Sequence, residues 1–124
     1  MTEPEAARRG LNYAGCSAPQ EQGGWIYKAQ SFDGKQCYKF TEPEPTTEPG
    51  GGKLKSKCPK GKECTALYHT HQTGPGWLKS FSDTDKETAK DITIYLKAGN
   101  EPNRIQKIFK GAEQSWNANS KTDK

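Results

Sequence analysis

The pair of residues with the clearest chemical meaning is His69-Thr70-His71, which contains both histidines of the chain. Side chains two positions apart on a β-strand point to the same face of a sheet, so the two imidazoles can converge on one metal ion. Neutral imidazole is a common ligand of zinc and other transition metals. The spacing therefore predicts a metal site with His69 and His71 as two of its ligands, although a single histidine is more often structural.

A third ligand is expected from the segment Ser82-Asp83-Thr84-Asp85. A catalytic zinc site usually takes three protein ligands and leaves one position for water. The segment follows a loop rich in glycine and proline and begins a predicted helix, so the Asp85 carboxylate can reach an adjacent strand. The same Ser-x-x-Asp pattern is close to a capping box, which stabilises a helix start without any metal. Capping and ligation can coexist in Asp85, and the sequence leaves both open.

A zinc hydrolase also needs a base beside the water that the metal activates. Glu21 is a candidate because it precedes Gly23-Gly24 and a predicted strand, where glycine permits close approach of the backbone to another group. The alternative for Glu21 is an exposed side chain in a loop. Residue chemistry alone favours that alternative.

Hydrophobic periodicity and turn residues predict the elements that would position these groups. The sequence predicts one α+β domain over residues 1–110, with a small mixed or antiparallel sheet packed by helices. Asp33-Gly34 is a hairpin turn signal. A polar loop or insertion is expected over 42–63 and a frayed C-terminal tail over 111–124, where Trp116 could pack back. The expected helices cover 3–14 and 83–97, and the expected strands cover 23–30, 35–40, 64–71 and 104–109.

The composition predicts a single domain with a small core. The chain has 124 residues, of which 30% are hydrophobic, and three Trp, five Tyr and four Phe must supply much of the buried surface. The formal net charge is +4. This mild excess suits nucleic acid, an anionic cell wall or an acidic protein surface, and it selects none of them. The lysines that concentrate between Lys53 and Lys62 are most simply a solvated basic loop.

The four cysteines are Cys16, Cys37, Cys58 and Cys64, and no two of them form a C-x-x-C pair. An even number in a short chain with a thin core favours two disulfides in an oxidising compartment over a four-cysteine zinc site. Sequence does not choose among the three possible pairings. No apolar run reaches transmembrane length, and the acidic first residues are not a signal peptide.

The order Glu21, His69-x-His71 and Ser82-x-x-Asp85 resembles the signature of JAMM/MPN metalloproteases, which have a cytidine-deaminase-like α+β fold. The resemblance implies that both histidines and Asp85 ligate Zn²⁺, that Glu21 is the general acid/base, and that Ser82 helps to stabilise the oxyanion. The ten residues between His71 and Ser82 make a longer gap than is usual in that family.

A longer set of motifs is similar to a C-terminal domain of Rhs-type polymorphic toxins. The match spans roughly residues 5–110 and includes an early alanine-rich helix. It implies an antibacterial effector delivered to the periplasm of a target cell by an Rhs or type VI carrier and opposed by an immunity protein. Such delivery explains disulfide-type cysteines without a signal peptide. The motifs are Glu21-x-Gly-Gly-x-Ile-Tyr27, Tyr68-His-Thr-His71, Phe81-Ser-Asp-Thr-Asp85 and the early Glu5-Ala-Ala-Arg-Arg.

The expected function is a zinc-dependent metallopeptidase or amidohydrolase, in which water on the zinc attacks an amide bond, for instance in a peptidoglycan stem peptide. One alternative is a non-catalytic binding module on the same fold, since many folds host both catalysts and inert relatives. The other is a toxin that targets nucleic acid, because aromatics interleaved with lysine can stack on bases. The lysines lie apart in sequence from Trp25, Trp77 and Trp116, and no nuclease constellation is present, so nucleic acid is disfavoured.

Overall fold

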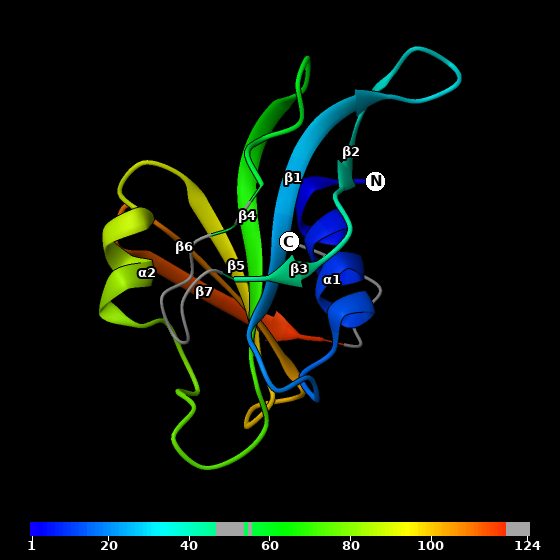
Figure 1. Ribbon diagram of the computed structural model, residues 1–124. Helices are drawn as coiled ribbons and strands as arrows, with labels where there is room; N and C mark the ends of the chain where they lie inside the picture. The colour runs from blue at the N-terminus through cyan, green and yellow to red at the C-terminus, as the bar shows by residue number, and fades with distance from the viewer. Residues whose placement is uncertain (47–53, 55, 119–124) are drawn as a thin grey trace.

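The chain folds around one mixed β-sheet in the computed structural model, which describes residues 1–46, 54 and 56–118 (Figure 1). This confirms the predicted α+β class with a mixed sheet. Over the described residues the elements are α1 (Glu3–Ala14), β1 (Gln22–Gln30), β2 (Gln36–Phe40), β3 (Glu44–Pro45), β4 (Glu63–His71), α2 (Asp83–Thr88), β5 (Thr93–Ala98), β6 (Arg104–Phe109) and β7 (Ala112–Asn117). None of the helices described is long and apolar enough to cross a membrane.

The sheet has the strand order β2-β1-β4-β5-β6-β7, and β3 pairs with β1. Neighbouring strands are antiparallel except β4 and β5, which are parallel. A parallel pair needs a long crossover, and residues 72–92, which include α2, provide it. The crossover leaves the end of β4 and returns to the sheet at the start of β5, so it can place α2 against the histidine strand.

Helix α1 covers one face of the sheet beside β1, β2 and β4 (Figure 1). Thr2 caps it, with its Oγ1 accepting a hydrogen bond from the Glu5 N–H at 3.2 Å. Its buried positions are Ala6, Ala7, Gly10 and Leu11. The prediction of a helix over 3–14 is confirmed.

Tyr68 of β4 lies at the centre of the core under α1 and is fully buried. Two glycines make room for its ring. A Cβ at Gly10 would lie 2.9 Å from the Tyr68 ring, and one at Gly24 would lie 2.6 Å from its hydroxyl oxygen. Alternate side chains of a strand face opposite ways, so His69 and His71 lie on the face of the sheet opposite to Tyr68. That face carries a second apolar cluster of Phe81, Ala89, Ile94, Leu96 and Ile108.

The predicted helix over 83–97 is wrong beyond its first two turns. Helix α2 ends at Thr88, and Thr93–Ala98 forms β5. This strand lies inside the sheet with both faces covered, so Ile94, Tyr95 and Leu96 are all buried. A strand buried on both faces is a continuous apolar run without alternation, and such a run can be mistaken for the apolar side of a helix.

The expected frayed tail is also wrong for residues 112–117, which form β7 at the edge of the sheet along β6. Lys110 and Gly111, with φ of 50° and 82°, make the tight turn between the two strands. Trp116 does pack back, and its ring lies 6.2 Å from that of Tyr95, edge to face. Residues 119–124 of the expected tail lie outside the described residues.

The expected polar loop over 42–63 is partly attached to the sheet. Strand β3 pairs with β1, Thr46 forms a bridge with Leu54, and β4 begins at Glu63. Of the lysines expected in this loop, Lys53 and Lys55 lie outside the described residues.

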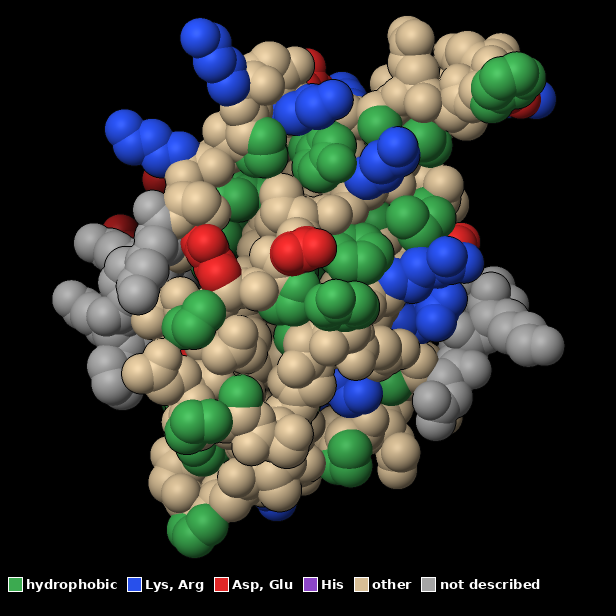
Figure 2. Space-filling model, turned by 45° about the vertical axis from the view of Figure 1, so that its right-hand side comes forward, with side chains coloured by type: hydrophobic (Ala, Val, Ile, Leu, Met, Phe, Trp, Pro, Cys, Tyr) green, Lys and Arg blue, Asp and Glu red, His purple; other side chains and the backbone are tan. Residues whose placement is uncertain are grey.

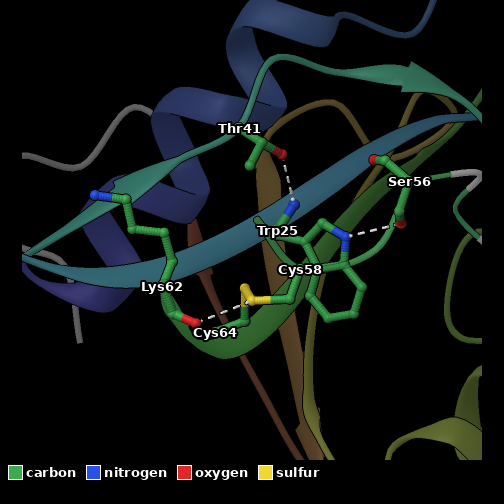
Figure 3. The surroundings of a disulfide bond; sticks show 6 residues. All are labelled: Trp25, Thr41, Ser56, Cys58, Lys62 and Cys64. Carbon is green, nitrogen blue, oxygen red and sulfur yellow. Dashed lines mark hydrogen bonds between the residues drawn. A yellow bond between two sulfur atoms is a disulfide. The ribbon is translucent and has the colours of Figure 1, made fainter. Parts of the chain in front are cut away.

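One disulfide, Cys58–Cys64, links this segment to β4, next to Trp25, whose indole N–H donates to the Ser56 carbonyl at 3.1 Å (Figure 3). The prediction of two disulfides is wrong, because Cys16 and Cys37 are free thiols. The Cys16 thiol contacts the Lys97 carbonyl of β5, whereas Cys37 lies on β2. Strands β1 and β4 separate these two, and sheet spacings of about 4.8 Å put them beyond the roughly 7 Å Cα separation that a disulfide can bridge.

Candidate metal centre

His69 and His71 lie near the carboxyl end of β4, on the face opposite α1, and their ring centroids are 5.2 Å apart. In the sheet His69 is paired with Gly23 of β1 on one side and with Leu96 of β5 on the other. Both imidazoles are buried, with 3% and 4% of their surface exposed. No histidine is visible on the face of the molecule in Figure 2.

Asp85 reaches the two histidines from the first turn of α2. Its Oδ1 lies 3.3 Å from His69 Nε2 and its Oδ2 lies 3.5 Å from His71 Nε2. The contact of His69 Nε2 lacks the alignment of a hydrogen bond. One ligand atom from each of the three residues falls within 4.8 Å of the others. The structure therefore brings the three predicted ligands together, in a geometry where they point into a common space.

Asp85 also completes a capping box with Ser82. The Ser82 hydroxyl oxygen accepts a hydrogen bond from the Asp85 N–H at 3.1 Å, and Asp85 Oδ2 accepts one from the Ser82 N–H at 2.9 Å. The other carboxylate oxygen, Oδ1, remains directed at His69. Capping by Asp85 is therefore confirmed, and the free direction of its other oxygen leaves metal ligation by the same side chain a prediction. Ser82 is half-buried, and its hydroxyl hydrogen is not used in the capping bond.

Glu21 immediately precedes β1 and is 1% exposed, so the alternative of an exposed loop side chain is wrong. Its Oε1 lies 4.0 Å from His69 Nε2. Neither carboxylate oxygen has a hydrogen-bond partner among the described residues. Burial raises the pKa of Glu21, and the nearby histidines only partly offset this. A buried carboxylate without partners is costly, so this position needs a ligand or water that the protein atoms do not supply.

Two residues that sequence reasoning missed hold the backbone beside Glu21. Thr70 lies between the two histidines but faces the other way, where its hydroxyl oxygen accepts a hydrogen bond from the Gln22 N–H at 3.2 Å. Its own hydroxyl donates to Gln72 Oε1 at 2.5 Å, and Gln72 Nε2 donates to the Ala18 carbonyl at 2.9 Å. Alternation along the strand places Thr70 and Gln72 away from the face that carries the histidines. No pattern in the sequence indicates the hydrogen-bond partners of these two residues.

A third missed contact fixes the orientation of His71. Its Nδ1 lies 3.0 Å from the carbonyl oxygen of Leu78. With the hydrogen on Nδ1 donated to that carbonyl, Nε2 carries the lone pair and faces Asp85. Histidines that bind metals are usually held in this way by a hydrogen bond from the other ring nitrogen.

Opposing charges stabilise the cluster. Burial lowers the pKa of His69, but the negative charges of Asp85 and Glu21 outweigh it, so that the pKa is raised above its usual value. Burial raises the pKa of Asp85, but the charge of His69 outweighs it, and the pKa falls well below the usual range. The centre therefore holds two carboxylates close to two imidazoles. A divalent cation would neutralise the negative charges of both carboxylates and leave both imidazoles uncharged.

These residues fit a metal ion. Ligand atoms about 2.0–2.1 Å from a tetrahedral zinc are roughly 3.4 Å from one another. One Asp85 oxygen lies 3.3 Å from His69 Nε2 and the other lies 3.5 Å from His71 Nε2, and one ligand atom from each of the three residues falls within 4.8 Å of the others, so the three can converge on one ion. Two histidines and a carboxylate leave one position open, as in catalytic zinc sites. Glu21, 4.0 Å from His69 Nε2, lies beyond the ligands.

No family model, curated protein or solved structure matches the chain. The resemblances to JAMM/MPN metalloproteases and to Rhs-type toxin domains rest on the sequence motifs alone and stay predictions.

Proposed function

We propose that this protein is a zinc-dependent hydrolase of amide bonds, a metallopeptidase or amidohydrolase. The observation that carries the proposal is the Glu21 carboxylate, which is buried, lacks a hydrogen-bond partner among the described residues and lies 4.0 Å from His69 Nε2. A purely structural ion pair between the histidines and Asp85 has no use for a second buried carboxylate. A general base beside a metal-activated water has that position and that environment.

His69, His71 and Asp85 would hold the metal. When bound, zinc would polarise the amide carbonyl and lower the pKa of a water molecule. Glu21 would accept a proton from the attacking water and deliver it to the leaving nitrogen. The hydroxyl hydrogen of Ser82 would be donated to the carbonyl oxygen as negative charge develops on it. Water attacks directly, so that no side chain of the protein forms a covalent bond with the substrate.

The substrate we propose is a peptide amide in a peptidoglycan stem. The Cys58–Cys64 disulfide supports an oxidising compartment such as the periplasm, where peptidoglycan lies. The net charge of +4 suits an anionic wall. Delivery to a target cell as an Rhs or type VI effector, with an immunity protein as partner, is proposed from the sequence motifs.

Zinc content and hydrolysis test this proposal separately. We expect about one zinc per chain in the wild type after dialysis against excess zinc and removal of the free metal, and a loss of zinc in His71→Ala. Glu21→Gln should keep its zinc but hydrolyse stem-peptide amides at least about 10²-fold more slowly, the usual contribution of a general base. Glu113→Gln makes the same change on the exposed side of β7 and should match the wild type. A wild type without zinc, or a fully active Glu21→Gln, would refute the proposal.

The second candidate is a binding module in which the metal is structural. The near-complete burial of the three ligands favours it, because a substrate must be able to reach a catalytic metal. In that case the wild type retains zinc and unfolds when the metal is chelated, but neither it nor any variant hydrolyses amides. Substitution of Glu21 would then leave the zinc content unchanged and would have no hydrolytic activity to reduce.

A further inference from the structure

Leu78 is an exposed apolar side chain in a segment that contacts the candidate metal centre directly. Its side chain is 53% exposed, while its backbone carbonyl is the partner of His71 Nδ1. The preceding residue, Trp77, is half-buried, and its ring centroid lies 6.1 Å from that of His71 at an interplanar angle of 34°. Two consecutive apolar side chains therefore border one of the proposed metal ligands.

An exposed leucine is common on protein surfaces, so the support for a role comes from how this segment is held. Asn100, in the turn after β5, donates from Nδ2 to the carbonyls of Gly74 at 2.8 Å and Trp77 at 3.3 Å, and its Oδ1 accepts from the Gly74 N–H at 3.0 Å. Gln106 of β6, which is 2% exposed, donates to the Lys79 carbonyl at 2.7 Å.

These bonds attach the segment 74–79 to the sheet at both ends and through His71 in the middle. A large exposed apolar side chain on a backbone that is already fixed can bind a ligand without the cost of ordering the segment that carries it. Apolar side chains beside a few fixed polar groups are the usual lining of a small-molecule or substrate site. Phe32, at the tip of the β1–β2 hairpin, is also fully exposed, but it lies in a turn far along the sheet from the histidines.

We infer that Trp77 and Leu78 form a substrate subsite that receives an apolar or aromatic side chain next to the scissile amide. The inference rests on the proposed function and adds to it the chemical class of the residue beside the cleaved bond. Stem peptides that present only small or charged groups at that position would be poorer substrates than those with an apolar group.

Two zinc-binding probes that differ only in an apolar tail can test this without knowledge of the natural substrate. Acetohydroxamic acid and N-hydroxy-4-phenylbutanamide share the metal-binding group, and their affinities for the zinc-loaded protein can be measured by calorimetry. We expect the phenyl tail to tighten binding about tenfold, the lower end of what burial of an aromatic group contributes. Leu78→Ser should remove most of this gain. It keeps the backbone carbonyl that His71 uses, and zinc content and circular dichroism establish that the variant is loaded and folded.

Phe32→Ser is the matched control, because it removes an exposed aromatic side chain distant from the centre and should leave the gain unchanged. The inference is overturned if the tail adds nothing in the wild type, if Leu78→Ser keeps the full gain, if Phe32→Ser loses it, or if neither hydroxamate binds the zinc-loaded protein. A wild type that retains no zinc is a different result, since it refutes the proposed function itself.

Discussion

Replacing Asp85 by Asn separates its two roles. The amide oxygen of Asn can still accept the hydrogen bond from the Ser82 N–H, so the helix cap is kept, while the negative charge directed at the histidines is lost. The zinc-free variant should therefore fold and keep α2. What it should lose is the additional stability that zinc confers on the wild type.

The size of that loss follows from binding linkage. A ligand present at 100 times its dissociation constant stabilises the folded state by about 2.7 kcal/mol. The unfolding entropy of about 2.1 cal/mol/K per residue is roughly 260 cal/mol/K for this chain, so zinc should raise the wild-type Tm by about 10 °C. If loss of the charged ligand weakens zinc binding about 100-fold, the same zinc concentration contributes about 0.4 kcal/mol, or roughly 1.5 °C.

Differential scanning fluorimetry of both proteins with and without zinc measures these shifts. Asp83→Asn is the control, because Asp83 is an exposed acidic residue in the same helical turn and its substitution changes the net charge equally. It should keep the wild-type shift of about 10 °C, as the linkage relation requires when zinc affinity is unaltered. An equal zinc response in wild type and Asp85→Asn would show that Asp85 is a capping residue and nothing more.

Three further substitutions test the surrounding structure by denaturant unfolding. Serine at both Cys58 and Cys64 should cost about 2 kcal/mol, the loop-closure entropy of a seven-residue loop, and leave zinc content unchanged; unchanged stability would mean that the bond does not form. Gly24→Ala should cost about 1–3 kcal/mol because its Cβ would lie 2.6 Å from the Tyr68 hydroxyl. Thr70→Val should cost about 1–3 kcal/mol because the Gln22 N–H loses its acceptor, and it should slow hydrolysis by displacing Glu21 without loss of zinc.

Much of the framework was predictable because its signals are local. Helix α1 has a capping threonine, an early proline and a terminal glycine, and the Asp33-Gly34 turn indicated the hairpin of β1 and β2. Strand β5 could not be recognised, because the burial of both its faces depends on β4 and β6, which are distant in sequence. Strand β7 was missed for the opposite reason: as an edge strand it buries little besides Trp116, so its sequence looks like a polar tail.

The candidate centre was predictable as a set of residues but not as an arrangement. Two histidines on one strand face follow from spacing, since a strand alternates whatever its neighbours are. The burial of Glu21 does not follow from spacing. It depends on the Gln22 N–H bonding to Thr70 and on the register that places Gly23 opposite His69. A Cβ at Gly23 would lie 2.7 Å from the Tyr68 carbonyl oxygen and 3.1 Å from His69 Cβ, so only glycine lets β1 approach this closely.

Asp85 shows most directly why sequence could not decide between structure and function at this site. In this chain the capping box and the predicted metal ligand use the same acidic side chain at the third residue of the helix, so the motif is the same for either role. In three dimensions the Ser82 N–H donates a hydrogen bond to Asp85 Oδ2, while Asp85 Oδ1 faces His69. The cap thereby fixes the carboxylate with one oxygen directed at His69. In the proposed metal centre the capping bond would contribute to preorganisation, because a ligand already held by its own helix would lose little freedom when the metal binds.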